Sequence, residues 1–321
     1  MANEAPIPNK ILLFGATGLI GEYILQALIE AKPKFEKLGI FTSPRTAKDK
    51  ADAIEKLKAQ GVDVVVGDVT NEDDVKQTYQ DYDTIISALG RGAIPLQIPL
   101  LTLAESTPNI HTFYPSEYGT DIEYSPTTSP HEPPHQFKLK VRAHIRDNIH
   151  RLKITYLVTG PYSDLYIGKL PNAPDAGTWD IANKTATLLG TGDEKVSFTT
   201  MHDVGVLLVA ALRTPTSSQV RTLKVNSFTA TPHQILTEYE KQTGAKWDVS
   251  YTSLDALRAA ERKAWEEGKL TATAYTLRRI WTEGGTLYEE RDNGRVGEPG
   301  VETLEEQVGA AVGRERGDGK L

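Results

Sequence analysis

Short apolar runs alternate with amphipathic stretches through the first half of the chain. Runs rich in β-branched and aromatic residues predict strands at Lys10–Phe14, Leu38–Thr42, Val62–Val66, Thr84–Ala88, Ile110–Tyr114 and Ile154–Val158. Helical periodicity predicts helices between them at Leu19–Ala31, Lys48–Gln60, Glu72–Thr78, Ile98–Glu105 and Phe137–His150. This alternation is typical of right-handed β-α-β units, so we expect an α/β fold with a doubly wound parallel sheet.

A glycine-rich turn joins the first predicted strand to the first predicted helix. Residues 15–21 read Gly-Ala-Thr-Gly-Leu-Ile-Gly. Glycine is needed where the backbone takes unusual dihedrals, approaches a ligand closely or lets a helix pack on a strand. The following helix offers free N–H groups and the positive end of its dipole, which suit a pyrophosphate. We therefore expect a Rossmann-like fold that binds a dinucleotide. The expected contacts here are Gly15, Thr17, Gly18, Leu19, Ile20 and Gly21.

The end of the second strand favours NADP(H) over NAD(H). An acidic residue about 20 positions beyond the glycines would bind a free ribose 2′-hydroxyl and repel a 2′-phosphate. Residues 42–48 contain no acid and read Thr-Ser-Pro-Arg-Thr-Ala-Lys. Ser43 and the guanidinium of Arg45 are expected to hold the phosphate. The alternative is that Arg45 and Lys48 are solvated surface charges.

Two further strand ends lie where a dinucleotide would pass. Asp68 follows the third predicted strand, and Ser87, Ala88 and Leu89 follow the fourth. We expect them on the adenine and nicotinamide sides of the cofactor. For Asp68, ordinary turn chemistry is an alternative. No Gly-Lys-Ser/Thr follows the glycines, which excludes a P-loop.

The pattern becomes mixed after Gly160. Helices are expected at His202–Leu212, Pro232–Thr243, Leu254–Gly268 and Leu270–Trp281. We expect residues 1–160 to bind NADP(H), and residues 161–312 to form a smaller α+β substrate-binding part, some of whose strands return to the main sheet. Residues 313–321 are expected to be a flexible tail. The polar, proline-rich segment between Tyr118 and Phe137 is interpreted as an active-site wall or lid, with disorder as the alternative.

The composition argues against several classes of binding partner. Of 321 residues 39% are hydrophobic and 25% charged, the formal net charge is −7, and cysteine is absent. An acidic chain without a dense basic run is a poor ligand for nucleic acid or anionic membranes. The absence of cysteine excludes disulfides and thiolate catalysis, and no stretch reaches the length of a bilayer span. We expect a cytoplasmic protein with a small-molecule substrate, as a monomer or a homodimer.

Three motifs resemble a known family. They are the glycine turn at 15–21, Phe-Tyr-Pro-Ser-Glu-Tyr-Gly at 113–119 and Lys-Leu-Lys-Val-Arg at 138–142, with Asp203-Val-Gly205 as a later match. Together they resemble the isoflavone reductase-like group of the NmrA-like family, atypical members of the short-chain dehydrogenase superfamily. The resemblance extends to about Tyr251. It implies a Rossmann-like domain with a smaller substrate domain, NADPH as hydride donor and reduction of small, often aromatic substrates.

The resemblance also implies a catalytic lysine on the helix after the fifth strand. Lys138 matches that place, and Lys140 is the neighbouring alternative. An ammonium there would stabilise negative charge that forms on oxygen during hydride transfer and could donate a proton. The competing interpretation is an exposed lysine on a helix rich in charge. No Tyr-x-x-x-Lys occurs in the chain, and Gln136 stands four residues before Lys140, so the usual tyrosine acid of the superfamily is absent.

Residues around these motifs are candidates for orienting the reactants. Ser116 and Lys138 complete the expected cofactor contacts, and Ser116 and Glu117 could orient the nicotinamide or the substrate. Tyr118 could stack on the substrate, and Tyr162 could line its pocket. Glu117, Tyr118 and Tyr162 are therefore the expected substrate contacts. A structured turn and aromatic core packing are the alternatives.

The histidines do not suggest a metal. His131 and His135 flank two prolines but have no acidic partner at ligand spacing, so we expect them to be exposed to solvent and expect no metal site. His202, beside Asp203, is expected to cap a helix or to pack. The leading hypothesis is an NADPH-dependent reductase assisted by Lys138. The alternative is a dinucleotide-sensing NmrA-like regulator that does no chemistry and binds a protein partner. A redox isomerase is disfavoured by the missing tyrosine.

Overall fold

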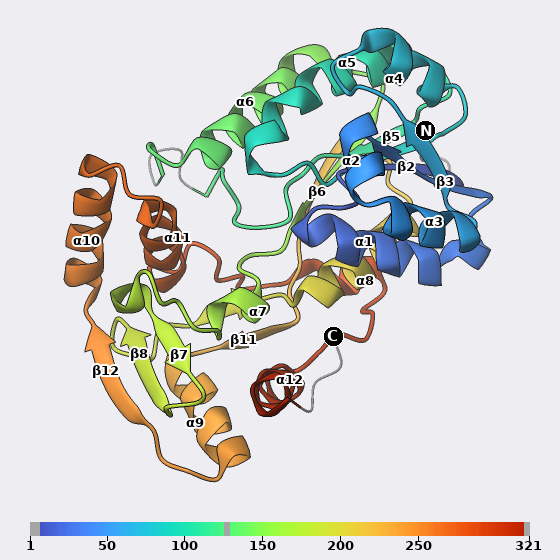
Figure 1. Ribbon diagram of the computed structural model, residues 1–321. Helices are drawn as coiled ribbons and strands as arrows, with labels where there is room; N and C mark the ends of the chain where they lie inside the picture. Colours follow the sequence, from blue (N-terminus) through green and yellow to red (C-terminus); the bar gives the residue numbers. More distant parts are fainter. Residues whose placement is uncertain (1–6, 125–128, 318–321) are drawn as a thin grey trace.

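A seven-stranded parallel sheet organises the computed structural model, which describes residues 7–124 and 129–317 (Figure 1). The strands lie in the order β10-β6-β5-β4-β1-β2-β3, and every neighbouring pair is parallel. They are β1 (Lys10–Phe14), β2 (Lys37–Thr42), β3 (Asp63–Val66), β4 (Thr84–Ser87), β5 (Thr112–Tyr114), β6 (Lys153–Val158) and β10 (Val220–Lys224). The expected doubly wound α/β fold is confirmed.

Helices cover both faces of this sheet, as Figure 1 shows. Successive side chains of a strand point to opposite faces, so Ile11 and Leu13 of β1 enter one core and Leu12 and Phe14 the other. The first face packs against α1 (Leu19–Glu30), α3 (Ala51–Ala59) and α8 (Met201–Leu212). The second packs against α4 (Glu72–Tyr79), α5 (Gln97–Ser106) and α6 (Pro133–Asn148). Burial on both sides explains why the inner strands β1 and β4 read as continuous apolar runs.

The strand order places a crevice beside β1. The chain runs outward from β1 through β2 to β3 and then returns to β4 on the other side of β1. Where the order reverses, the segments that leave the carboxyl ends of the two strands diverge, and open α/β sheets bind ligands there. The glycine turn after β1 and the segment after β4 both start at this point.

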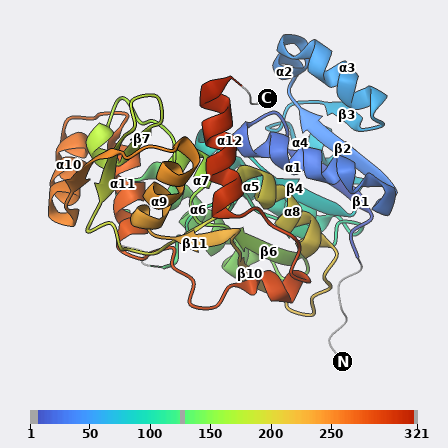
Figure 2. The ribbon, with the colours of Figure 1, turned by 90° about the horizontal axis from the view of Figure 1, so that it is seen from below.

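The second half of the chain forms two small sheets beside the main one (Figure 2). Their strands are β9 (Val196–Phe198) with β11 (Phe228–Ala230), and β7 (Thr178–Asp180), β8 (Thr185–Leu189) and β12 (Asp248–Thr252). The helices of this half, besides α8, are α7 (Ser163–Tyr166), α9 (Pro232–Thr243), α10 (Leu254–Glu266), α11 (Ala272–Thr282) and α12 (Leu304–Arg316). Short 3-10 helices are η1 (Lys32–Lys34), η2 (Arg91–Leu96), η3 (Pro174–Ala176) and η4 (Asp292–Val296). Strand β10 also comes from this half, yet it pairs with β6 in the main sheet.

Two helix starts differ from the sequence-based expectation. A separate helix, α2 (Pro44–Asp49), precedes α3, because the Oγ of Ser43 accepts a hydrogen bond from the Thr46 backbone N–H at 3.1 Å and caps it. Helix α6 begins at Pro133 rather than at Phe137. Glu132 caps it by accepting from the backbone N–H of His135 at 3.0 Å, and proline is tolerated in a first turn. The proline-rich segment is therefore shorter than expected, and its residues 125–128 lie outside the described part.

The prediction of a flexible tail from residue 313 is wrong for its first part. Helix α12 continues to Arg316 and ends at Gly317, which has φ +80°. Val308, Ala311 and Val312 bury one face of this helix in the core of the second half, and residues 318–321 lie outside the described part. Strands β7, β8, β9, β11 and β12 were not predicted, since they are short and separated by turn-rich sequence. None of the helices described is long and apolar enough to cross a bilayer.

Candidate active site

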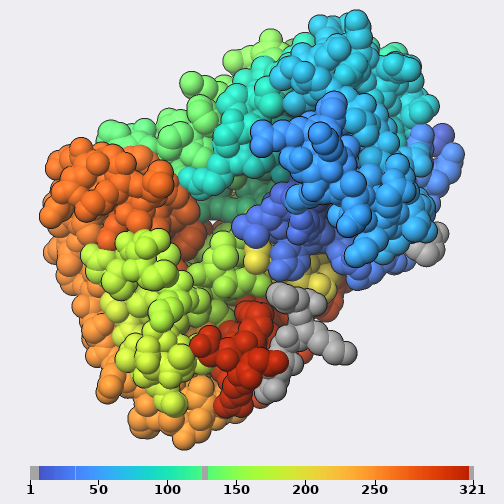
Figure 3. Space-filling model, in the orientation of Figure 1, coloured from blue at the N-terminus to red at the C-terminus, as the bar shows by residue number. Residues whose placement is uncertain are grey.

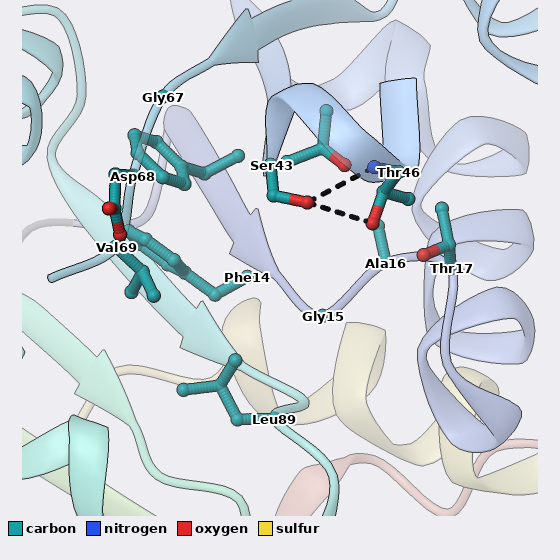
Figure 4. Close-up of a pocket in the computed structure, with 12 residues that line it drawn as sticks. Phe14, Gly15, Ala16, Thr17, Ser43, Thr46, Gly67, Asp68, Val69 and Leu89 are labelled. Carbon is teal, nitrogen blue, oxygen red and sulfur yellow. Dashed lines mark hydrogen bonds between the residues drawn. The ribbon is translucent and has the colours of Figure 1, made fainter. Parts of the chain in front are cut away.

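Two cavities lie on either side of the glycine turn, at the carboxyl ends of the parallel strands. The smaller one, about 200 Å³, is bounded by residues 14–17, by 41–43 with Thr46, by 67–69 and by Leu89, and we call it the turn cavity (Figure 4). The larger one, about 500 Å³, begins at Gly18 and extends toward the second half of the chain, and we call it the main cavity. Figure 3 shows a hollow on this face between the blue-to-teal N-terminal part and the orange C-terminal part. Leu89 lines both cavities.

The glycine turn has the geometry expected for a dinucleotide. Gly15 has φ +78°, and a Cβ there would lie 2.4 Å from the carbonyl oxygen of Ala88. A Cβ on Gly21 would lie 2.0 Å from the carbonyl oxygen of Gly15, so the helix passes directly beneath the turn. Gly18 precedes α1 without a side-chain cap, which leaves the first N–H groups of this helix free for a ligand. The backbone therefore forms a cradle that fits a pyrophosphate.

Hydroxyl groups face the turn cavity where β2 ends. Figure 4 shows Ser43 and Thr46 on the side opposite Asp68, with the Ser43 Oγ 3.0 Å from the Thr46 Oγ1. Arg45 does not line this cavity. Its side chain is 90% exposed and its Nε is 3.4 Å from Asp49 Oδ2. Sequence reasoning missed Lys50, whose Nζ donates to the carbonyl oxygen of Thr17 at 2.9 Å.

The sequence does not single out Lys50, because its helical pattern predicts one helix across residues 48–60. The break between α2 and α3 falls at this residue and turns its side chain toward the glycine turn. Only the folded structure brings the side chain of Lys50 to the glycine turn, so the sequence alone could not identify it.

The other strand-end residues divide into two groups. Asp68 lines the turn cavity, and its carboxylate accepts hydrogen bonds from the N–H and Oγ1 of Thr70 at 2.8 and 2.7 Å, which lower its pKa. Ala88 and Leu89 line the main cavity. Ser87 is fully buried, lines neither cavity, and its hydroxyl has no hydrogen-bond partner in the described part of the chain.

The main cavity has a largely apolar wall with a few polar groups. Leu19 and Ile20 of α1, Ile94 of η2, and Leu277 and Trp281 of α11 supply apolar surface. The polar wall comes from the segment after β5 and from α6, and it includes Ser116, Thr120, His135 and Lys138. This mixture is typical of a small-molecule site, where a few polar groups fix the orientation of an apolar ligand.

Lys138 reaches the main cavity from α6, and Lys140 does not. The Nζ of Lys138 donates to the carbonyl oxygen of Glu117 at 2.6 Å. Burial lowers the pKa of Lys138, and the neighbouring Arg142 and Arg91 act in the same direction, although Glu117 partly opposes them. Lys140 is exposed and lies over the ring of Phe137. Of the two lysines considered, Lys138 alone lines the cavity.

A buried ion pair holds the residue that anchors Lys138. Arg142 lies one helical turn after Lys138, and its Nε and Nη2 donate to the two carboxylate oxygens of Glu117 at 3.0 and 2.9 Å. Its Nη1 also donates to Asp121 at 3.2 Å. Burial favours the neutral acid of Asp121, but Arg142 and Lys224 hold its pKa below the usual value. The carboxylate of Glu117 therefore binds Arg142, and its main-chain carbonyl binds Lys138.

The remaining expected contacts also lie in the cavity wall. Ser116 Oγ donates to the carbonyl oxygen of Leu89 at 3.0 Å and so joins the segments after β5 and β4. The hydroxyl of Tyr162 donates to the carbonyl oxygen of Tyr118 at 2.5 Å, and burial raises the pKa of both tyrosines. Both rings line the cavity. In this structure each tyrosine combines core packing with a surface toward the cavity.

The expectation that both loop histidines are exposed is wrong for His135. It lies in the first turns of α6, is only 6% exposed and lines the main cavity. The early start of α6 at Pro133 is the physical reason, because it turns the residue inward. His131 is exposed, with its ring 6.1 Å from that of Trp265. His202 is also exposed and does not cap α8, since Thr200 does so.

One group of residues has the spacing of a metal site. His202, Asp203 and Glu302 bring ligand atoms within 4.8 Å of one another. Asp203 is already engaged: its Oδ2 accepts from the Ser227 hydroxyl and from the Glu302 N–H at 2.5 and 2.8 Å. These bonds give the carboxylate a structural role at the start of α8.

A polar link that sequence reasoning missed starts from Arg91 in the wall of the main cavity. The guanidinium of Arg91, after β4, binds the carboxylate of Glu132, which is fully buried ahead of α6. The same Arg91 nitrogen lies 3.3 Å from the Oγ1 of Thr273 on α11. Three segments far apart in the sequence therefore meet at this point, which local patterns could not reveal.

Comparison with known proteins places this geometry in a wider group. A sequence model of the NmrA-like family matches residues 8–267. The phenylcoumaran benzylic ether reductase Pyrc5 of Pyrus communis is 25% identical over 251 residues, which cover 78% of this chain and 79% of that protein. An isoflavone reductase of Pisum sativum is 24% identical over 299 residues, covering 88% and 90%.

Solved structures share the fold. The leucoanthocyanidin reductase of Vitis vinifera, in a binary complex with NADPH, superposes with a TM-score of 0.77 at 19% identity, covering 95% of this chain and 99% of that one. The protein AtPrR2, with NADP⁺ and (+)-pinoresinol, superposes with a TM-score of 0.80 at 19% identity, covering 94% and 97%.

Proposed function

This chain belongs to the NmrA-like family, and from that premise we propose that it is an NADPH-dependent reductase of a small aromatic or conjugated substrate. The cofactor would lie across the switch point of the sheet, with its pyrophosphate over Gly15–Gly21 and its adenosine end in the turn cavity. The hydroxyls of Ser43 and Thr46 and the cations Arg45 and Lys50 would hold the 2′-phosphate. The relatives support this assignment, because two of the solved structures contain NADPH or NADP⁺.

The observation that carries the proposal is the position of Lys138. Its ammonium lies in the wall of the same cavity that begins at the glycine turn. When bound, NADPH supplies a hydride to an electrophilic carbon of the substrate. A substrate oxygen that gains negative charge in that step would accept a hydrogen bond from the Lys138 Nζ, which can then transfer a proton to it.

The electrostatics of the cavity suit this role. Because burial lowers the pKa of Lys138, proton transfer from it is easier than from a solvated lysine. The hydrogen bond to the Glu117 carbonyl fixes the direction of the ammonium without neutralising its charge. The reaction consumes one hydride from NADPH and one proton, which Lys138 would recover from solvent.

The substrate class follows from the wall and from the relatives. Leucine, isoleucine, tyrosine and tryptophan side chains fit flat apolar rings, and few polar groups are available to orient them. The sequence relatives are named as reductases of phenylcoumaran benzylic ethers and of isoflavones. We propose an oxygen-bearing aromatic substrate of similar size.

A panel assay tests the proposal. The purified protein is mixed with NADPH and with aromatic enones, ketones, aldehydes and benzylic ethers, and NADPH oxidation is followed while NADPH affinity is measured separately. For an oxidised substrate, Lys138→Met should lower kcat by about 10²–10⁴-fold, the usual contribution of a positioned acid. The exposed Lys140→Met is the matched control and should retain wild-type turnover.

The outcome also distinguishes a dinucleotide sensor from an enzyme. NADPH binding without oxidation across the whole panel would contradict the reductase and favour the sensor. Full turnover by Lys138→Met would contradict the role of this lysine while leaving the reductase in place.

A further inference from the structure

His135 is a buried polar side chain in the main cavity that hydride transfer and proton donation by Lys138 do not use. It precedes Lys138 by three residues on α6, so the two side chains lie on the same face of this helix. Both line the cavity. Arg91 lines the same cavity, and its charge, like that of Lys138, disfavours the protonated imidazole.

The hydrogen bond between His135 and Ser129 bears on the tautomer of the imidazole. Its Nδ1 lies 2.8 Å from the Oγ of Ser129, which is itself buried. If Nδ1–H donated to Ser129, the hydroxyl proton of Ser129 would have no acceptor among residues 7–124 and 129–317. If Ser129 donates to Nδ1, the donor left without a partner among the described residues is Nε2–H, on a side chain that lines the main cavity. A donor sealed in the interior costs more than one that faces a cavity, so among the described residues the favoured tautomer has Nδ1 as the acceptor and the proton on Nε2.

The Nε2–H group is left for a ligand. Among the described residues it has no hydrogen-bond partner, and it is not one of the sealed side-chain atoms without partners. Burial, reinforced by the cations Lys138 and Arg91, lowers the pKa of His135 to about 3. The imidazole is therefore neutral at physiological pH and can donate a hydrogen bond without adding charge to the cavity.

We propose that His135 is a specificity-determining residue, which donates a hydrogen bond from Nε2 to a second oxygen of the substrate while Lys138 binds the oxygen that gains charge. The substrate class is then an aromatic compound with two oxygen acceptors, one at the reacting centre and one elsewhere on the ring system. An ether, carbonyl or phenol oxygen satisfies the second position. This inference rests on the proposed reductase function and names a feature of its substrate.

The test compares substrates that differ by one acceptor. Benzaldehyde is compared with 2-, 3- and 4-methoxybenzaldehyde, since the three isomers present the ether oxygen at different places. The wild-type enzyme should prefer at least one isomer, with kcat/KM higher by roughly 3- to 10-fold, the range of one neutral hydrogen bond. His135→Phe should remove this preference, so that benzaldehyde and its three methoxy isomers are reduced with similar kcat/KM.

Further variants separate a hydrogen bond from a packing effect. His135→Gln keeps a donor at similar reach and should restore part of the preference. Ser129→Ala removes the hydroxyl that donates to Nδ1, so the proton is no longer held on Nε2 and the preference should weaken. His131→Phe, in the same segment but outside the main cavity, is the control and should behave as the wild type. If His135→Phe is unstable, the preference of His135→Gln and Ser129→Ala decides.

The inference can fail independently of the reductase. Oxidation of NADPH with benzaldehyde and its methoxy isomers at equal kcat/KM would overturn the inference and leave the reductase standing. If none of these aldehydes is reduced, the same four compounds are titrated into the complex with NADP⁺, and binding is followed by tryptophan fluorescence, since Trp281 lines the main cavity. Tighter binding of one methoxy isomer, lost in His135→Phe, would then support the donor, and equal binding of all four would overturn it.

Discussion

Alanine at Gly15 and alanine at Gly18 should have opposite consequences, although the two glycines stand three residues apart. Gly15 has φ +78°, and a Cβ on it would lie 2.4 Å from the carbonyl oxygen of Ala88. Gly18 has φ −86° and ψ 170°, which alanine adopts freely, and a Cβ there would meet only the Gly15 carbonyl oxygen, at 3.3 Å. The fold itself disfavours alanine at position 15. At position 18 alanine is disfavoured only by a ligand that lies over the turn.

The expected cost at Gly15 follows from two contributions. Left-handed backbone costs a residue with a Cβ about 1–2 kcal/mol. Overpacking against a backbone atom that cannot rotate away adds about 1–3 kcal/mol. Gly15→Ala should therefore lower the free energy of unfolding by about 2–5 kcal/mol, a large part of the 5–15 kcal/mol that is usual for a folded protein.

The expected cost at Gly18 is a loss of affinity. Alanine has fewer conformations than glycine in the unfolded chain, which stabilises the folded variant by about 0.4–1 kcal/mol at a permitted backbone position. This gain offsets the tight contact at 3.3 Å. The free energy of unfolding should thus stay within about 1 kcal/mol of the wild type. The new methyl group would occupy the space of the pyrophosphate, and an overpacking cost of about 1–3 kcal/mol corresponds to roughly 5- to 150-fold weaker NADPH binding.

Urea denaturation and calorimetric titration with NADPH measure the two quantities on the same protein samples. Wild-type NADPH affinity in a folded Gly18→Ala variant would refute the placement of the pyrophosphate over the turn. Wild-type stability of Gly15→Ala would refute the strain argument, because it would require the segment after β4 to move without cost.

Three further perturbations test separate parts of the site. Arg45→Ala and Lys50→Ala should each weaken NADPH binding by roughly 10- to 100-fold, the range of a charged hydrogen bond, and leave NADH binding unchanged in parallel titrations. Stability should fall as the pH is lowered from 6.5 toward 3, because the unfolded state binds a proton on His135 that the folded state, with a pKa of about 3 beside Lys138 and Arg91, does not. Denaturation at several pH values should show that His135→Phe reduces this slope by up to about 1.4 kcal/mol per pH unit. Arg142→Met should lower the free energy of unfolding by about 3–5 kcal/mol, because it leaves Glu117 buried without its partner. The exposed Arg146→Met should change it by less than about 1 kcal/mol in the same measurement.

The main sheet was predictable because most of its strands are buried on both faces, and the partly exposed edge strand β3 is still a short apolar run. Each of the first six strands is a short apolar run bounded by turn residues, and all six predictions overlap the strands observed. Helix ends that depend on a cap were less accurate. Ser43 and Glu132 both cap helices that start at proline, and the sequence patterns predicted neither of these helix starts.

The second half resisted prediction for a different reason. Its strands have three to five residues, and most of them pair with partners that are distant in sequence, as β8 does with β12. Such pairs are stabilised by contacts across the strands and by the aromatic cluster beneath them, which a local pattern does not contain. The link from Arg91 to Glu132 and Thr273 was hidden for the same reason, since it joins three elements that meet only in the folded chain.

Glu117 binds two cations, Lys138 and Arg142, and so connects the sequence motifs at 113–119 and 138–142. Glu117 follows β5, and Lys138 and Arg142 stand one turn apart on α6, so both of their side chains reach the same residue. Its carboxylate is held by Arg142 and its carbonyl oxygen by Lys138 at 2.6 Å, which makes the position of the ammonium depend on a fully buried ion pair. A lysine fixed by a carbonyl keeps a positive charge that no direct partner compensates, whereas an ion pair with the carboxylate itself would have no net charge and would raise the pKa of the lysine. The acid therefore contributes to the cavity through its backbone, and its side chain secures the helix that presents Lys138.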